Sequence, residues 1–92
     1  MPDKIELSNG FELTQTEGIH SITEEDEDIN VVFADGLEVN ICRCRFNPDK
    51  FDLHIPNRNG GETTGGRIEV YLAAEVVVER VGEFAAAAAK PS

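Results

Sequence analysis

The chain has 92 residues, of which 18 are Asp or Glu and 8 are Lys or Arg, so its formal net charge at pH 7 is −10. This acidity excludes binding to free DNA through bulk electrostatics, because such binding depends on Lys and Arg that displace counterions from phosphates. It also disfavours anionic membrane surfaces. A chain of this length supports one domain with a thin hydrophobic core.

The negative charge is concentrated in the first part of the chain. Residues 1–40 contain eleven acidic residues and one basic residue, whereas residues 41–92 contain seven of each. The whole excess therefore belongs to residues 1–40, and such an asymmetry indicates an interaction face.

The N-terminal segment and the two cysteines predict a cytoplasmic protein. Met-Pro-Asp-Lys-Ile-Glu has neither a basic region nor an apolar run, and the longest apolar stretch, residues 84–89, is too short to cross a membrane. We therefore expect no secretory signal and no membrane contact. In that compartment Cys42 and Cys44 are expected to be reduced thiols.

Alternation of apolar and polar residues predicts strands in residues 1–56, beginning with a hairpin. Ile5 and Leu7 alternate with polar residues, and so do Phe11 and Leu13. A two-residue turn between them would put the two apolar sets on opposite sides of the hairpin. We therefore predict a three-residue loop with Gly10 in the left-handed conformation, which pairs Leu7 with Phe11 and Ile5 with Leu13.

A second hairpin is predicted at residues 29–45, around Asp35-Gly36, a strong signal for a two-residue turn. With that turn, one face is expected to point inward: Asn30, Val32 and Ala34 beside Leu37, Val39 and Ile41. The other face is expected to be amphipathic and partly covered: Ile29, Val31 and Phe33 beside Glu38, Asn40 and Cys42.

Further strands and one loop are predicted on either side of this hairpin. Ile19–Thr23 is a weaker strand signal, whereas Phe51, Leu53 and Ile55 alternate clearly with polar residues. Pro56 ends that strand or places it at a sheet edge. Residues 57–66 are ten polar residues with four glycines, which predicts a flexible loop.

The C-terminal part predicts a helix. Residues 67–72 fit either a final strand or the first turns of a helix, and residues 73–90 fit a helix, because apolar residues recur there at helical spacing: Ala73, Val77, Val81, Phe84 and Ala88. Glu75, Glu79 and Glu83 follow at four-residue spacing on a separate ridge. The predicted fold is α+β, a small antiparallel β-sheet with one C-terminal α-helix across a face, in a single domain.

One set of residues has the types of a tetrahedral zinc site: Cys42, Cys44, His20 and His54. A single residue between two cysteines in a strand directs both thiols out of one extended face, whereas structural zinc pairs usually span a turn. The glycine pairs in residues 60–66 lack the Lys-Ser/Thr of a phosphate loop, and no activated nucleophile has a local signature. We expect no metal, no cofactor and no catalytic residue, and a protein that is not an enzyme.

The densest acidic segment has two interpretations: Glu24, Glu25, Asp26, Glu27 and Asp28. It is either a solvated loop between strands or an anionic patch that docks on Lys and Arg of a partner. The charge asymmetry and the ridge of Glu75, Glu79 and Glu83 support docking, so all eight carboxylates are candidate partner-binding residues.

Basic residues of the later part form a second candidate surface: Arg43, Arg45, Lys50, Arg58 and Arg67. They fit ordinary charge balance and protection of a sheet edge. The alternative is a contact to RNA through Arg43, Arg45 and Arg58.

The acidic first half, the run at 24–28 and the strand-rich body with an Ala-rich tail resemble the small, acidic, phage-encoded anti-CRISPR proteins. The whole chain, opening Met-Pro-Asp-Lys-Ile-Glu-Leu-Ser-Asn-Gly, is similar to those directed at type I-F systems. The resemblance implies a non-enzymatic inhibitor in the host bacterial cytoplasm that binds Cas proteins of the crRNA-guided surveillance complex and blocks target DNA binding. Such complexes hold guide and target in a positive channel, which an acidic protein can occupy. The alternative is a small acidic phage or bacterial structural or regulatory subunit whose acidity serves solubility.

Overall fold

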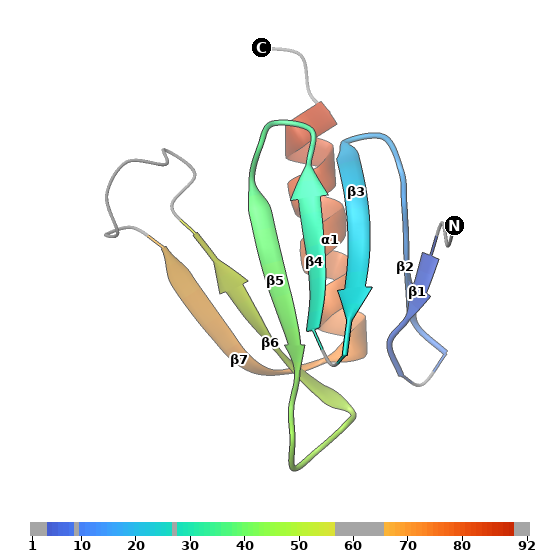
Figure 1. Cartoon of the computed structure of the whole chain (residues 1–92), viewed down its shortest axis with the longest axis vertical. Helices are drawn as coiled ribbons and strands as arrows, with labels where there is room; N and C mark the ends of the chain where they lie inside the picture. The colour runs from blue at the N-terminus through green and yellow to red at the C-terminus, as the bar shows by residue number, and fades with distance from the viewer. Residues whose placement is uncertain (1–3, 9, 27, 57–65, 90–92) are drawn as a thin grey trace.

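The computed structural model describes residues 4–8, 10–26, 28–56 and 66–89 (Figure 1). Within these residues seven strands precede one helix: β1 (Lys4–Glu6), β2 (Glu12–Thr14), β3 (Ile19–Glu25), β4 (Asp28–Phe33), β5 (Glu38–Arg43), β6 (Lys50–Ile55), β7 (Arg67–Ala73) and α1 (Ala74–Ala89). The predicted α+β fold is confirmed, with the strands divided between two antiparallel sheets.

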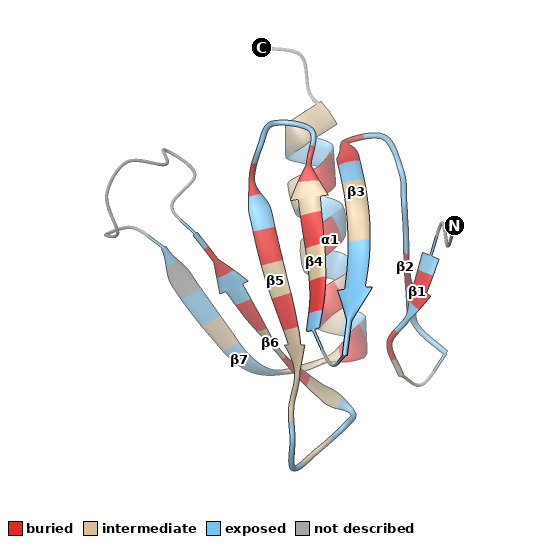
Figure 2. Ribbon diagram, viewed as in Figure 1, coloured by how far each residue is buried: buried red, intermediate tan, exposed pale blue. Residues whose placement is uncertain are grey.

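The larger sheet has five strands in the order β3-β4-β5-β6-β7, so each strand pairs with its neighbours in the sequence. α1 packs across one face of this sheet, and in the described residues the other face carries no second layer (Figures 1 and 2). β1 and β2 form a separate hairpin that contacts β3 and α1. The core therefore lies between α1, one sheet face and this hairpin.

The β1–β2 hairpin has the predicted register. Ile5 pairs with Leu13, the amide of Leu7 donates a hydrogen bond of 2.8 Å to the carbonyl oxygen of Phe11, and Gly10 has a φ of 82°. Ile5, Leu7 and Leu13 are all buried. The requirement that both apolar sets share a face therefore selects the loop length correctly.

The predicted register of the β4–β5 hairpin is wrong by one residue. Val31 pairs with Val39 and Ile29 with Ile41. The chain turns through a three-residue loop, because the amide of Phe33 donates to the carbonyl of Leu37 (2.8 Å). Gly36, the third loop residue, takes the left-handed conformation with a φ of 95°.

This one-residue shift exchanges the expected faces of β4, since successive side chains alternate between the two sides of a strand. The buried residues are the larger apolar ones: Ile29, Val31, Phe33, Leu37, Val39 and Ile41. Asn30 and Val32 lie instead on the face opposite α1, together with Glu38, Asn40 and Cys42. Burying Phe33 and Ile29 in place of Ala34 and Asn30 gains more from the hydrophobic effect.

Other predicted elements are confirmed with adjusted bounds. β3 extends two residues beyond the predicted Thr23, and residues 67–72 belong to a strand, β7, rather than to the helix. β6 lies between β5 and β7, so Pro56 ends a central strand and does not mark an edge. The predicted loop at 57–66 lies, except for Gly66, outside the described residues.

The helix presents a slightly rotated apolar stripe to the sheet. Its buried residues are Ala74, Val77, Val81 and Ala85, whereas the predicted Ala73, Phe84 and Ala88 are half-buried. Small alanines at both ends of the stripe allow the helix backbone to approach its neighbours closely. In the described part of the chain no helix is long and apolar enough to cross a membrane.

Candidate functional site

The acidic segment forms the tip of the β3–β4 hairpin. Glu24 and Glu25 end β3, Asp26 occupies the turn with a φ of 53°, and Asp28 begins β4. All four side chains are exposed, and Glu27 lies outside the described residues. The carboxylates therefore lie at the end of two hydrogen-bonded strands, not in a long loop.

Pairing within this hairpin brings like charges together. Glu25 and Asp28 are direct cross-strand partners, and like charges in that position destabilise a sheet. The stability of the hairpin therefore does not account for acidic residues at both positions, which favours a role for these charges in binding.

The carboxylates of α1 are exposed as predicted: Glu75, Glu79 and Glu83. Each step along this ridge rises about 6 Å, since an α-helix rises about 1.5 Å per residue. The first turn of α1, which holds Glu75, lies at the same end of the molecule as the β3–β4 turn (Figure 1). The first turn of α1 therefore lies toward the same end as the acidic turn, and Glu83 lies farther along the helix.

The carboxylates of the acidic turn take part in neither of the two ion pairs found among the described residues, whereas Glu79 and Glu83 of the ridge act on the charge of Arg80. Lys4 pairs with Glu12 at 3.6 Å, and Arg80 pairs with Glu69 at 3.1 Å. The hydrogen bond to Glu69, assisted by its charge, raises the pKa of Arg80 further. Both pairs lie away from the acidic turn and join elements of the fold, Arg80 linking α1 to β7.

Of the three candidate RNA-contacting arginines, the structure describes Arg43 and Arg45. Arg43 is half-buried; its Nη1 donates a hydrogen bond of 3.1 Å to the carbonyl oxygen of Leu7, and its guanidinium lies 5.1 Å from the centre of the Phe51 ring. This arginine ties the β1–β2 hairpin to the large sheet. Arg45 is exposed and Arg58 lies outside the described residues.

Arg45 lies beside the acidic turn. It lines an open depression of about 700 Å³ together with Glu25, Asp26 and Asp28. Arg45, which the sequence assigns to a second, basic candidate surface, therefore adjoins the densest acidic group and limits the local excess of negative charge there.

The residues considered for zinc are not gathered into a site. Among the described residues no group of three or more His, Cys, Asp or Glu is placed to hold a metal ion. His20 lies on β3 and His54 on β6, three strands apart in the sheet, or about 14 Å. Cys42 and Cys44 are free thiols.

Cys42 lies on the face of the sheet opposite α1, called the open face below, and its burial and its acidic neighbours there make it a poorly reactive thiol. Its pKa is raised from 9.0 to about 11, first by burial and then by the negative charges of Asp28 and Asp52. Its Sγ donates to Oδ1 of Asn40 at 2.8 Å. A thiol with this pKa is protonated at neutral pH and is a weak nucleophile.

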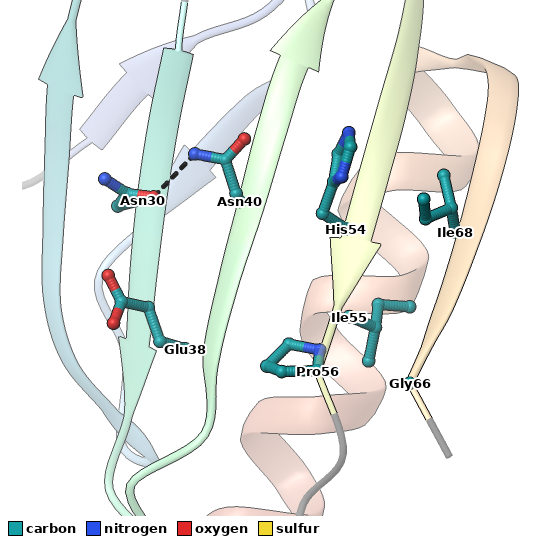
Figure 3. Close-up of a pocket in the computed structure, with 8 residues that line it drawn as sticks. All are labelled: Asn30, Glu38, Asn40, His54, Ile55, Pro56, Gly66 and Ile68. Carbon is teal, nitrogen blue, oxygen red and sulfur yellow. Dashed lines mark hydrogen bonds between the residues drawn. The ribbon is translucent and has the colours of Figure 1, made fainter. Parts of the chain in front are cut away.

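The face of the sheet opposite α1 is a surface that the sequence reasoning missed. Cross-strand partners form a row over all five strands: Thr23, Asn30, Asn40, His54 and Ile68. In the middle of the row, Nδ2 of Asn40 donates a hydrogen bond of 2.7 Å to Oδ1 of Asn30 (Figure 3).

An open groove of about 670 Å³ runs over this row. Residues from β4 to the start of β7 line it, among them Asn30, Glu38, Asn40, His54, Pro56 and Ile68 (Figure 3). The polar residues that alternate with the buried ones in β4, β5 and β6 predict this surface, but only if the register of β4 and β5 is known.

Comparison of the chain with models of known protein families finds no family model that matches. Comparisons with curated protein sequences and with solved structures likewise find no match.

Proposed function

We propose that the protein is a non-enzymatic binding protein whose acidic surface docks on a Lys- and Arg-rich surface of a protein complex. As the specific partner we propose the crRNA-guided surveillance complex of a type I-F CRISPR–Cas system, whose target DNA binding the protein would block. The specific partner rests on the resemblance in size, charge and general organisation, and the docking mode rests on the placement of the carboxylates.

One observation carries the docking mode: carboxylates of like sign are held close together on paired strands at the β3–β4 turn. Glu25 and Asp28 face each other across the hairpin, at the same end of the molecule as Glu75. Ordered carboxylates of this kind give a basic partner a fixed pattern of negative charge. Such complementarity raises the association rate and suppresses partners of the wrong charge.

Binding of this kind would inhibit the complex by occupation. A surveillance complex pairs guide RNA with target DNA inside a positively charged channel. An acidic protein that occupies the entrance to such a channel competes with DNA for the same lysines and arginines, and needs no chemical step.

The test is a gel shift of target DNA with purified type I-F complex and saturating protein. The proposal expects DNA binding to be lost, and undiminished DNA binding would overturn the surveillance complex as partner. Glu25→Lys is compared with Glu17→Lys, which makes the same charge change at an exposed site between β2 and β3, at the opposite end of the molecule.

The two variants separate docking from general acidity. Juxtaposed like charges in an interface cost several kcal/mol, so Glu25→Lys is expected to weaken binding about tenfold or more, while Glu17→Lys leaves it almost unchanged. Equal effects of both variants would contradict docking through the turn. If the protein is instead a structural or regulatory subunit whose acidity serves solubility, reversal of Glu24, Glu25 and Asp26 together leaves its partner binding intact.

A further inference from the structure

The open face of the sheet carries an apolar strip along β7. Ile68 is 60% exposed and Val70 is 61% exposed, and because they are two residues apart in a strand they point to the same side. Tyr71, at the bulge that follows, is 58% exposed. Large exposed apolar residues grouped on a small protein mark interaction sites more often than scattered single ones.

Ile68 of this strip lines the groove on the open face, and Val70 and Tyr71 continue the strip beyond it along β7. Ile68 lies on one side of the groove and Glu38 of β5 on the other, with Pro56 at the end of β6 between them (Figure 3). No lysine or arginine is among the described residues that line the groove. A cation on a ligand can therefore pair with the carboxylate of Glu38, which is among the described lining residues.

The floor between these two sides is polar and already ordered. The hydrogen bond between Asn40 and Asn30 fixes both amides, and the thiol of Cys42 donates a hydrogen bond to Oδ1 of Asn40. The next row across the sheet adds the carboxylates of Asp28 and Asp52. The open face thus changes from apolar along β7 to acidic over β4, β5 and β6, which carry Asp28, Glu38 and Asp52.

We infer that this groove is the docking site for an amphipathic helix of a partner protein, with aliphatic side chains over Ile68 and Val70 and a lysine or arginine against Glu38. The inference rests on the proposed function, because the amphipathic helix is the part of the basic partner that would bind this protein.

The dimensions fit this occupant. β7 and β5 are two strand spacings apart, or about 10 Å, and a helix with its side chains is about 10–12 Å across. A helix lying on β6 therefore spans from the apolar strip to Glu38. A helix already covers the other face of the same sheet in this way, as α1 does in Figure 1.

The test is a titration of the ¹⁵N-labelled full chain, followed by NMR, with a short leucine–lysine peptide patterned as an amphipathic helix. The side-chain amides of Asn30 and Asn40 report directly on the groove. We expect saturable shifts of these signals and of the Ile68 backbone amide. A leucine–glutamate peptide of the same pattern serves as the charge control and is expected to cause no such shifts.

Variants then separate the groove from the rest of the acidic surface. Burying an aliphatic side chain contributes about 1.5–3 kcal/mol, so Ile68→Asp is expected to weaken peptide binding about tenfold or more, and Glu38→Lys is expected to weaken it too. Glu17→Lys, at an exposed site between β2 and β3, makes the same charge change away from the groove and is expected to leave binding unchanged. Circular dichroism verifies that each variant is folded.

Three outcomes would overturn the inference. Shifts confined to residues 24–28 and 75–83 would overturn the groove while leaving the proposed acidic docking intact. Absence of saturable shifts anywhere would overturn the groove and also remove support for docking on basic surfaces. Equal binding of the leucine–glutamate peptide would show that charge complementarity does not select the ligand.

Discussion

Gly18 is the position where a single methyl group should damage the fold most. Its φ is 97°, and a Cβ placed there would collide with the carbonyl oxygen of Ala85 and lie 2.9 Å from its carbonyl carbon. The Gly18 carbonyl also accepts a hydrogen bond of 2.8 Å from the amide of Ala34. Backbone lies on both sides of this residue, so no flexible side chain can move to make room.

The cost of Gly18→Ala has two parts. A left-handed backbone conformation costs a non-glycine residue about 1–2 kcal/mol, and overpacking of a close contact costs about 1–3 kcal/mol. The sum, about 2–5 kcal/mol, is a large fraction of the roughly 5–15 kcal/mol that stabilises a typical domain. For a domain of this size each kcal/mol lowers Tm by about 4–8 °C, so we expect a decrease of at least about 10 °C.

Two other glycines provide matched controls in the same thermal denaturation assay. Gly36 has a φ of 95° but no atom within 4 Å of the position of a Cβ, so Gly36→Ala should show the conformational cost alone. Gly82, inside α1, also has open space, and Gly82→Ala should stabilise the protein by roughly 0.5–1 kcal/mol. If Gly18→Ala costs no more than Gly36→Ala, the close approach of α1 to Gly18 is refuted.

Three further predictions concern single side chains. In a Cys44→Ser variant, Cys42 should react with iodoacetamide at pH 8 about 100-fold more slowly than an ordinary thiol, because its pKa is about 11. The folded state holds the thiol proton more tightly than the unfolded state does. The free energy of unfolding should therefore fall as pH rises from about 9 to 11. Arg43→Ala should cost about 1–3 kcal/mol and speed amide hydrogen exchange in β1 and β2, because Leu7 loses its hydrogen bond from Arg43; unchanged exchange there would contradict the tie. Asp52→Ala should cost about 0.5–1.5 kcal/mol in urea denaturation, because the amide of Tyr71 loses the acceptor 2.9 Å away, and an unaltered midpoint would contradict this role.

The two hairpins show what the sequence can predict about register. Both turn through three residues with a left-handed glycine at the third, Gly10 in one and Gly36 in the other. In the first hairpin, the requirement that the apolar residues share a face determines the loop. In the second hairpin, Asp35-Gly36 is a strong signal for a two-residue turn, and the sequence-based prediction follows this local motif instead of requiring that the largest apolar residues share a face. The burial of Phe33 shows that the gain from the core exceeds the preference of the turn.

The candidate site could be predicted only in part, for related reasons. Exposure of the acidic run and of the α1 ridge follows from charge, because isolated carboxylates are rarely buried. Pairing of Glu25 with Asp28 could not be expected, since it opposes local stability. The groove over Asn30 and Asn40 depends on the register of β4 and β5, so an error of one residue removes it from a sequence-based prediction. Arg43 follows the buried Ile41 by two residues in β5 and therefore points to the same side of the sheet, which is a signal for the structural role that it has.

The charge of the chain has opposite consequences for the free protein and for a complex. Ten uncompensated negative charges on 92 residues repel one another in the folded state, and the facing Glu25 and Asp28 add a local cost. Salt screens this repulsion, so ionic strength should stabilise the free protein, whereas a complex that depends on attraction to lysine and arginine should weaken. A domain that needed acidity only for solubility could spread these charges over its surface. Five of the acidic residues are instead adjacent at positions 24–28, which reduces stability, and attraction to a basic partner is the compensation that the proposed function supplies.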